Sequence, residues 1–219
     1  MSVNNGIKNY KKLTAEINKL KKAPQKVLDR TISDAKKRVP GWVSTEVARQ
    51  YGIKKKEVGD GKTSTVKVEG DSMGTLRIVY RGRVLTPTHF NMSPQAPKEG
   101  GGAYTLKATF IKEKRATLGK VKKLTKKQRA ALGKNFRREG TQTSDHSPIM
   151  LMRTGNLKAG GTDYIPFQRK STDRNDLKVI KTISVPQMID SKRTAPNITK
   201  AINEGLGKRL DQHLKLLEK

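Results

Sequence analysis

The chain of 219 residues carries 48 lysines and arginines against 19 aspartates and glutamates, which gives a formal net charge of +29. With 33% hydrophobic residues it can bury one modest core, and the absence of cysteine excludes disulfides, thiolate metal sites and cysteine nucleophiles. No apolar run approaches the roughly 18 residues that span a bilayer. Residues 1–6 lack the apolar region of a secretory signal, so we expect a soluble protein made in the cytoplasm.

The positive charge is concentrated in one segment. Residues 107–139 hold 13 basic and 2 acidic side chains, and such self-repulsion is tolerable mainly beside a polyanion. This segment is therefore the candidate surface for DNA or for an acidic partner, although charge runs also occur simply on solvated helix faces. The candidate residues are Lys112, Lys114, Arg115, Lys120, Lys122, Lys123, Lys126, Lys127, Arg129, Lys134, Arg137 and Arg138.

Residues 1–58 are predicted to form an N-terminal helical region. From Leu13 to Val39, apolar residues recur every three or four positions between lysines, as in an amphipathic helix. Pro24 either kinks this helix or begins a second one at its first turn.

A break is expected shortly afterwards in this region. Pro40 and Gly41 predict the end of a helix. Ser44 or Thr45 would then cap a short further helix that ends before Gly52. Two or three helical pieces are the result.

Residues 59–193 are predicted to form a sheet region, because the apolar period there changes from about 3.6 to 2. Segments 65–68 and 76–80 flank a glycine-containing turn and indicate a hairpin. Further strands are expected at 103–111, at the apolar run 149–152 and at 178–185.

The remainder of that region is expected to be irregular. Residues 84–102 contain three prolines and three consecutive glycines, which is typical of a loop. Residues 112–148 are predicted to be a solvated basic insertion with at most one weak helix. The fold class is therefore α+β: a small, mainly antiparallel sheet of four or five strands packed by helices at both ends of the chain, in one domain overall.

Residues 194–219 are predicted to form a C-terminal helix. Its apolar residues step by three or four positions, although Gly205 and Gly207 each weaken a helix by about 1 kcal/mol relative to alanine. The face formed by Leu206, Leu210 and Leu214 is expected to pack against the sheet or a neighbouring subunit.

The sequence contains no convincing motif for catalysis, phosphate binding or metal binding. Gly61-Lys62-Thr63 resembles the end of a phosphate-binding loop, but Lys56 stands where that motif needs glycine. The three histidines, His89, His146 and His213, lie far apart, and His213 is expected at a partly exposed surface position. No carboxylates are paired for acid–base work. We therefore expect no enzyme, no metal and no cofactor.

Three segments together resemble the prophage minor tail protein Z family, the tail-completion proteins of tailed phages. They are residues 46–58, residues 85–90 and the most specific one, Ile183-Ser184-Val185-Pro186-Gln187-Met188-Ile189. The resemblance covers most of the chain in order. It does not extend to the basic stretch at 112–148 or to residues 160–167.

The resemblance implies a structural virion component in the neck region of the tail, at its head-proximal end. Such proteins form rings around the DNA channel, sixfold by analogy with the family. Tail-terminator, tail-tube or head-connector proteins would be its neighbours, and axial double-stranded DNA is one candidate partner. Ser184 to Met188 would form a fixed turn that orients the last helix or contacts a partner.

Two rival functions remain open from the residues alone. A non-enzymatic cellular nucleic-acid-binding protein explains the charge of +29 equally well, although only 5% of the residues are aromatic. A phage DNA-processing enzyme is disfavoured by the lack of a carboxylate cluster. Acidic surfaces of adjoining ring proteins could also attract the basic segment in place of DNA.

Overall fold

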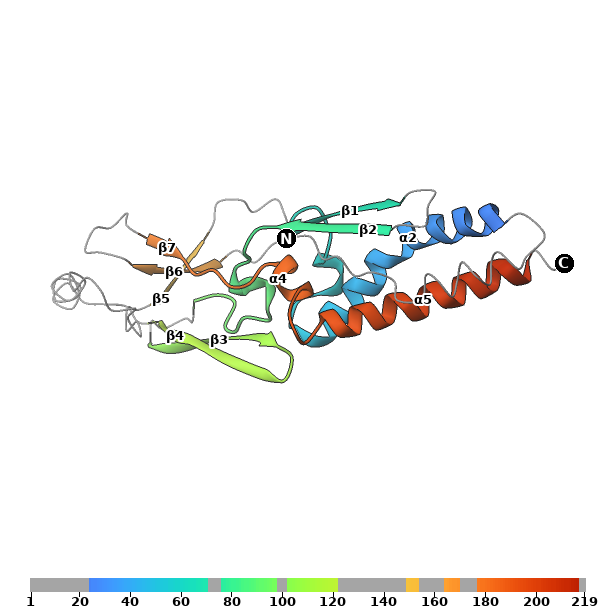
Figure 1. The fold of residues 1–219 in the computed structure, drawn as a ribbon. Helices are drawn as coiled ribbons and strands as arrows, with labels where there is room; N and C mark the ends of the chain where they lie inside the picture. The colour runs from blue at the N-terminus through green and yellow to red at the C-terminus, as the bar shows by residue number, and fades with distance from the viewer. Residues whose placement is uncertain are drawn as a thin grey trace. The chain divides into compact units, whose positions relative to one another are not determined.

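The computed structural model describes residues 24–70, 76–97, 102–121, 149–153, 164–169 and 177–216. It contains helices and two sheets, so the predicted α+β class is confirmed. Contacts between residues divide the chain into two compact units, and Figure 1 colours their elements along the chain. The helical unit takes its described residues from 24–50, 54–83 and 184–216, and the sheet unit takes its own from 51–53 and 84–183.

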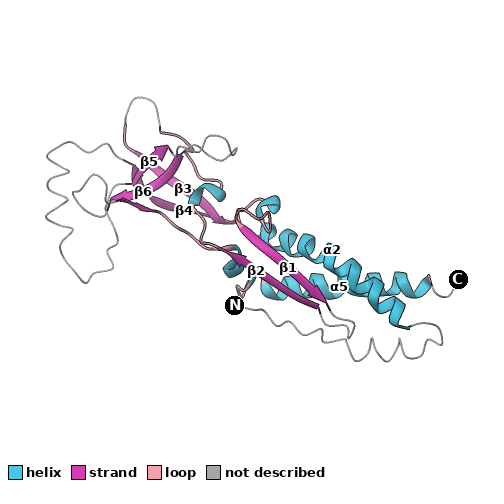
Figure 2. Cartoon of the chain, turned by 90° about the horizontal axis from the view of Figure 1, so that it is seen from above, coloured by secondary structure: helices cyan, strands magenta, loops and turns pink. Residues whose placement is uncertain are grey.

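Two long helices run side by side in the helical unit, in opposite directions (Figures 1 and 2). They are α2 (Pro24–Gln50) and α5 (Ala195–Lys215). Val27 of α2 and Leu210 of α5 are buried together at 1% and 3% exposure, with Leu28 and Leu214 packed against them. The predicted C-terminal helix is confirmed. Residues 1–23, with the first part of the predicted amphipathic helix, lie outside the described residues, so both alternatives for Pro24 stay predictions.

The predicted break at Pro40 and Gly41 is wrong, because α2 continues through both residues. The Ser44 and Thr45 hydroxyls both donate to the Gly41 carbonyl, at 2.9 and 2.7 Å, and neither caps a new helix. The valines on either side of the proline are at most 2% exposed, and their burial offsets a proline cost of about 3 kcal/mol. These valines are Val39, Val43 and Val47.

The predicted hairpin is confirmed, but it forms a two-stranded sheet of its own. Strands β1 (Ser64–Gly70) and β2 (Leu76–Gly82) pair antiparallel along their whole length. An isolated two-stranded sheet is marginally stable in water. Here β1 packs against α2, and β2 packs against the short helix α4 (Val185–Ile189), so the helices support the hairpin.

A five-stranded sheet organises the sheet unit, in the order β3-β4-β5-β6-β7. Its strands are β3 (Tyr104–Ile111), β4 (Lys114–Val121), β5 (Ile149–Arg153), β6 (Tyr164–Arg169) and β7 (Leu177–Val179). The β3–β4 hairpin and the antiparallel β5–β6–β7 meander are joined by one parallel pair, Val121 with Ile149. On β3, the side chains of Leu106 and Ala108 are fully buried.

Two strands of this sheet were not predicted. Lys114–Val121 forms β4, so this part of the expected solvated insertion is wrong, while residues 122–148 lie outside the described residues. Tyr164–Arg169 forms β6 even though proline is unusual in a central strand. The Pro166 carbonyl still accepts from the Ile180 N–H at 3.0 Å, although the residue has no N–H of its own to donate.

Two other predicted strands differ in extent or burial. Strand β7 ends at Val179, because the following chain bonds to Leu85 instead: the Leu85 carbonyl accepts from the Thr182 N–H at 2.8 Å. The apolar run 149–152 forms β5, but it is not buried throughout. Ile149 is 2% exposed, but Met152 is 39% exposed, since β5 alternates between two faces. The described residues of the predicted loop, 84–97 and 102, are irregular apart from a short helical turn, η2 (Pro87–His89).

Candidate polyanion-binding surface

The β3–β4 hairpin is anchored along its outer edge by irregular chain. Ser93 and Lys107 exchange two backbone hydrogen bonds, at 2.8 and 3.0 Å, and the Gly52 N–H donates to the Phe110 carbonyl at 3.0 Å. Only glycine fits at position 52, because a Cβ there would lie 1.9 Å from the Thr109 carbonyl oxygen. The edge is therefore covered, and the hairpin is held as a defined platform.

A bulge in β4 sets which side chains face solvent. Leu106 pairs with Gly119 while Lys107 pairs with Thr117, so Leu118 is an extra residue. Gly119 has a φ of +151°, and a Cβ there would lie 2.8 Å from Cδ1 of Ile149. Glycine at this position therefore leaves room for the Ile149 side chain of the neighbouring strand.

Five basic side chains of the hairpin are exposed: Lys107, Lys112, Lys114, Arg115 and Lys120. Glu113 is the one acidic residue between Tyr104 and Val121. Within the described ranges, none of the five basic residues forms an ion pair. On β1, by contrast, Lys67 lies 2.6 Å from Glu69. The hairpin thus presents uncompensated positive charge.

The structure places four of the twelve predicted basic residues on this hairpin: Lys112, Lys114, Arg115 and Lys120. The other eight lie outside the described residues, namely Lys122, Lys123, Lys126, Lys127, Arg129, Lys134, Arg137 and Arg138. Lys107 was not among the predicted residues. Its signal was its position between Leu106 and Ala108, since a residue between two buried strand positions faces the opposite side.

The segment Ser184 to Met188 forms the start of α4 rather than a simple turn. Ser184 caps it reciprocally with Gln187: its Oγ accepts from the Gln187 N–H, and its own N–H donates to Gln187 Oε1 at 2.9 Å. Pro186 stands in the first turn, where a missing N–H costs nothing. Val185 and Met188 are fully buried. Capping and packing within the helical unit therefore account for these residues.

The leucine face of α5 packs against α2. Leu210 is buried, and Leu206 and Leu214 are half-buried. Val27 and Leu28 of α2 take the place of the sheet that we expected, while contact with a neighbouring subunit stays a prediction. This helix pair is a folding element of the helical unit.

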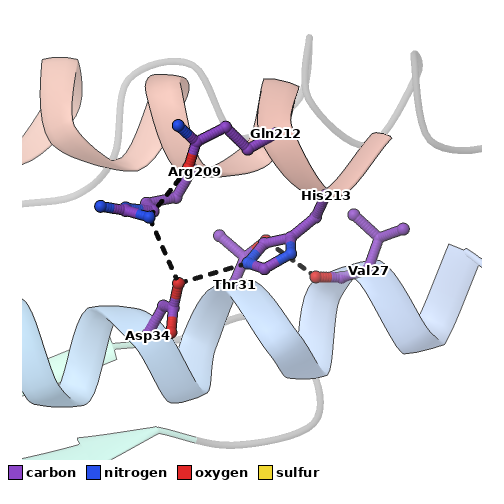
Figure 3. A network of polar contacts seen from close by, with 6 residues as sticks. All are labelled: Val27, Thr31, Asp34, Arg209, Gln212 and His213. Carbon is purple, nitrogen blue, oxygen red and sulfur yellow. Dashed lines mark hydrogen bonds and ion pairs between the residues drawn. The ribbon is translucent and has the colours of Figure 1, made fainter. Parts of the chain in front are cut away.

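His213 is partly exposed, with 15% of its side chain accessible to solvent. It faces α2, where its Nε2 lies 3.4 Å from Oδ2 of Asp34 (Figure 3). Nη1 of Arg209 lies 4.0 Å from the same oxygen and donates to Oε1 of Gln212 at 2.8 Å. A polar cluster thus bridges the two helices. No local pattern links His213 to this partner, because Asp34 lies 179 positions away in the sequence.

Gly205, expected only to weaken α5, has a packing role. The ring of Trp42 on α2 lies against its Cα, and a Cβ at this position would meet Cη2 of that ring at 2.4 Å. A Cβ added at Gly207, two residues further on, would meet nothing within 4 Å. The two glycines of α5 therefore differ: only Gly205 is required by packing.

The segment Gly61-Lys62-Thr63 is a turn into β1, so it lacks the helix N-terminus that a phosphate-binding loop uses. Oδ1 of Asp60 accepts from the N–H groups of Lys62 and Thr63 at 2.8 and 2.7 Å. Desolvation is the largest single influence and raises the pKa of Asp60. The hydrogen bonds from Thr63 and Lys62 together outweigh it, so this pKa lies below its ordinary value.

Within the described parts of the chain, no group of three or more histidines and carboxylates could hold a metal ion. No described helix is long and apolar enough to cross a membrane. Comparisons with protein-family models, with curated proteins and with solved structures found no match. The candidate surface is the basic face of the β3–β4 hairpin, with five exposed cations between Lys107 and Lys120.

Proposed function

We propose that this chain is a structural virion protein of a tailed phage, a tail-completion or neck component that helps join the tail to the head. The observation that carries the proposal is the ordered resemblance of three segments to the prophage minor tail protein Z family. The most specific segment, Ile183–Ile189, includes a capped helix whose apolar residues are buried. These residues stabilise the fold through capping and burial, which suits a structural protein.

The basic hairpin has a clear use in this role. In a ring, every copy would contribute its five exposed cations to the same axis or rim. Each phosphate that such cations neutralise releases condensed counterions, which favours binding. The acidic partner would be either axial DNA or an acidic surface on a neighbouring tail-terminator, tail-tube or head-connector protein.

Imaging of intact particles and complementation of a phage that lacks the gene test the proposal together. We expect the protein as a ring at the neck, and we expect the mutant to accumulate separate heads and tails. Leu210→Asp, which places a charge in the α2–α5 contact, should fail to complement. Leu216→Asp, at a position 61% exposed directly after the same helix, is the matched control and should complement. Normal particles without the protein would refute the proposal.

The unpaired cations of the hairpin also favour a second candidate, a non-enzymatic nucleic-acid-binding protein of the cell. Gene neighbourhood separates the two. Adjacent tail-tube, tape-measure or head-connector genes support the virion role, whereas ribosomal or replication genes support the cellular role.

A further inference from the structure

We propose that the outward face of the β3–β4 hairpin binds the phosphate backbone of duplex DNA without sequence preference. The inference rests on the proposed function and deepens it, because it names the partner of the basic surface. The hairpin is the light green ribbon in Figure 1.

The pairing register places three of the five cations on one face. Lys107 pairs with Thr117, and Thr105 pairs with Lys120, so these residues share the side opposite to buried Leu106. Arg115 lies two residues before Thr117 on β4 and therefore shares that side too. Neighbouring strands lie about 4.8 Å apart, and residues two apart on a strand are separated by about 6.6 Å. Since a duplex carries one charge per about 1.7 Å of axis, each cation on this face can meet a phosphate.

The chemistry of the face suits a phosphate backbone better than a protein. Cores of protein interfaces are depleted of charged residues and enriched in large apolar or aromatic ones. Among the described residues, the exposed large hydrophobic side chains are Val84, Met152 and Leu216, and none lies on the hairpin. The face instead offers lysine, arginine and threonine, the donors that proteins use toward phosphate oxygens.

The aromatic residues of the hairpin argue against single-stranded nucleic acid. Proteins bind unpaired bases by stacking them on exposed aromatic rings. Phe110 packs edge to face with Phe90, with ring centroids 5.3 Å apart, and Tyr104 is half-buried. Neither ring is offered as a stacking platform, so the duplex backbone is the form of nucleic acid that this face fits.

Two triple variants with the same change in net charge test the inference. The hairpin triple is Lys107→Gln, Arg115→Gln and Lys120→Gln, and the control triple is Lys26→Gln, Lys56→Gln and Lys208→Gln, at exposed positions of the helical unit. Circular dichroism and thermal unfolding of both variants show whether each is folded. Fluorescence anisotropy then measures binding of the full-length proteins to two labelled duplexes of unrelated sequence as salt is raised.

We expect equal affinity for the two duplexes. The log–log salt dependence should become shallower by about 2.7 in the hairpin triple, at about 0.9 per phosphate contact, and by less than about 1 in the control triple. Between 50 and 200 mM salt, the wild type should therefore lose roughly 40-fold more affinity than the hairpin triple. Equal slopes for the two triples, or a strong preference for one duplex, would overturn the inference.

Particle assembly distinguishes this inference from the proposed function. If the hairpin triple binds DNA like the wild type but fails to join tails to heads, the hairpin docks on an acidic protein and the inference is wrong. If the hairpin triple loses DNA binding as expected while the wild-type protein is absent from particles, the inference holds and the virion role fails.

Discussion

Exchanging each glycine of α5 for alanine tests the packing of the helical unit. Gly207→Ala should stabilise the protein by about 1 kcal/mol, because alanine favours a helix and its Cβ meets nothing within 4 Å. Gly205→Ala gains the same propensity, but its Cβ would approach three ring atoms of Trp42 at 2.4, 2.6 and 2.7 Å. Overpacking of this kind costs about 1–3 kcal/mol, so we expect the variant to be neutral or destabilised by up to about 2 kcal/mol.

A double-mutant cycle assigns the cost to the indole ring. In a Trp42→Ala background the obstacle is gone, so Gly205→Ala should become stabilising by about 1 kcal/mol. Chemical denaturation followed by helix circular dichroism measures all four variants. Trp42 is the single tryptophan, so its fluorescence also reports any displacement of the ring in the Gly205→Ala protein. Stabilisation by Gly205→Ala in the wild-type background would refute the close contact between the two helices.

Three further substitutions test other parts of the fold. Leu210→Ala should cost about 2–5 kcal/mol in a denaturant titration, while Leu216→Ala at an exposed position should stay within about 0.5 kcal/mol. Asp60→Asn should lower the unfolding midpoint near neutral pH; because the folded pKa is depressed, the carboxylate stabilises above pH about 4, and the difference should vanish as pH falls through the folded pKa. A difference that is constant with pH would contradict this. Gly119→Ala should destabilise the hairpin through its positive φ and the 2.8 Å approach to Ile149, and unchanged thermal unfolding would contradict the bulge.

The long helices and the first hairpin could be predicted because their signals are local. The leucines of α5 recur at helical spacing, and β1 and β2 alternate around a turn, so each pattern is complete within a few residues. The residues against which each apolar face packs lie far away in the sequence. Leu210 meets Val27 across 183 positions of sequence, and periodicity says that a face is buried without saying against what.

The failures come from rules that tertiary packing overrides. Pro40 normally ends a helix, but the fully buried valines around it keep α2 intact. A proline such as Pro166 normally excludes a central strand, because it has no N–H to donate, yet β6 pairs with β5 on one side and β7 on the other. Lys114–Val121 carries three exposed cations and little apolar content, so it was assigned to a solvated insertion. A strand needs buried side chains on only one of its faces. On β4, Gly119 has no side chain, and Ile149 of β5 packs against its backbone instead.

Charge density located the basic region in the sequence, but only the register shows which charges act together. Counting places Lys107 and Lys120 thirteen positions apart. The bulge at Gly119 and the pairing of Thr105 with Lys120 bring them to one face beside Arg115. An unstructured arm would lose conformational entropy when each cation is ordered on a polyanion. A hairpin anchored by Gly52 and Ser93 has already lost that entropy during folding, so its three cations should contribute more to binding than an equal charge elsewhere.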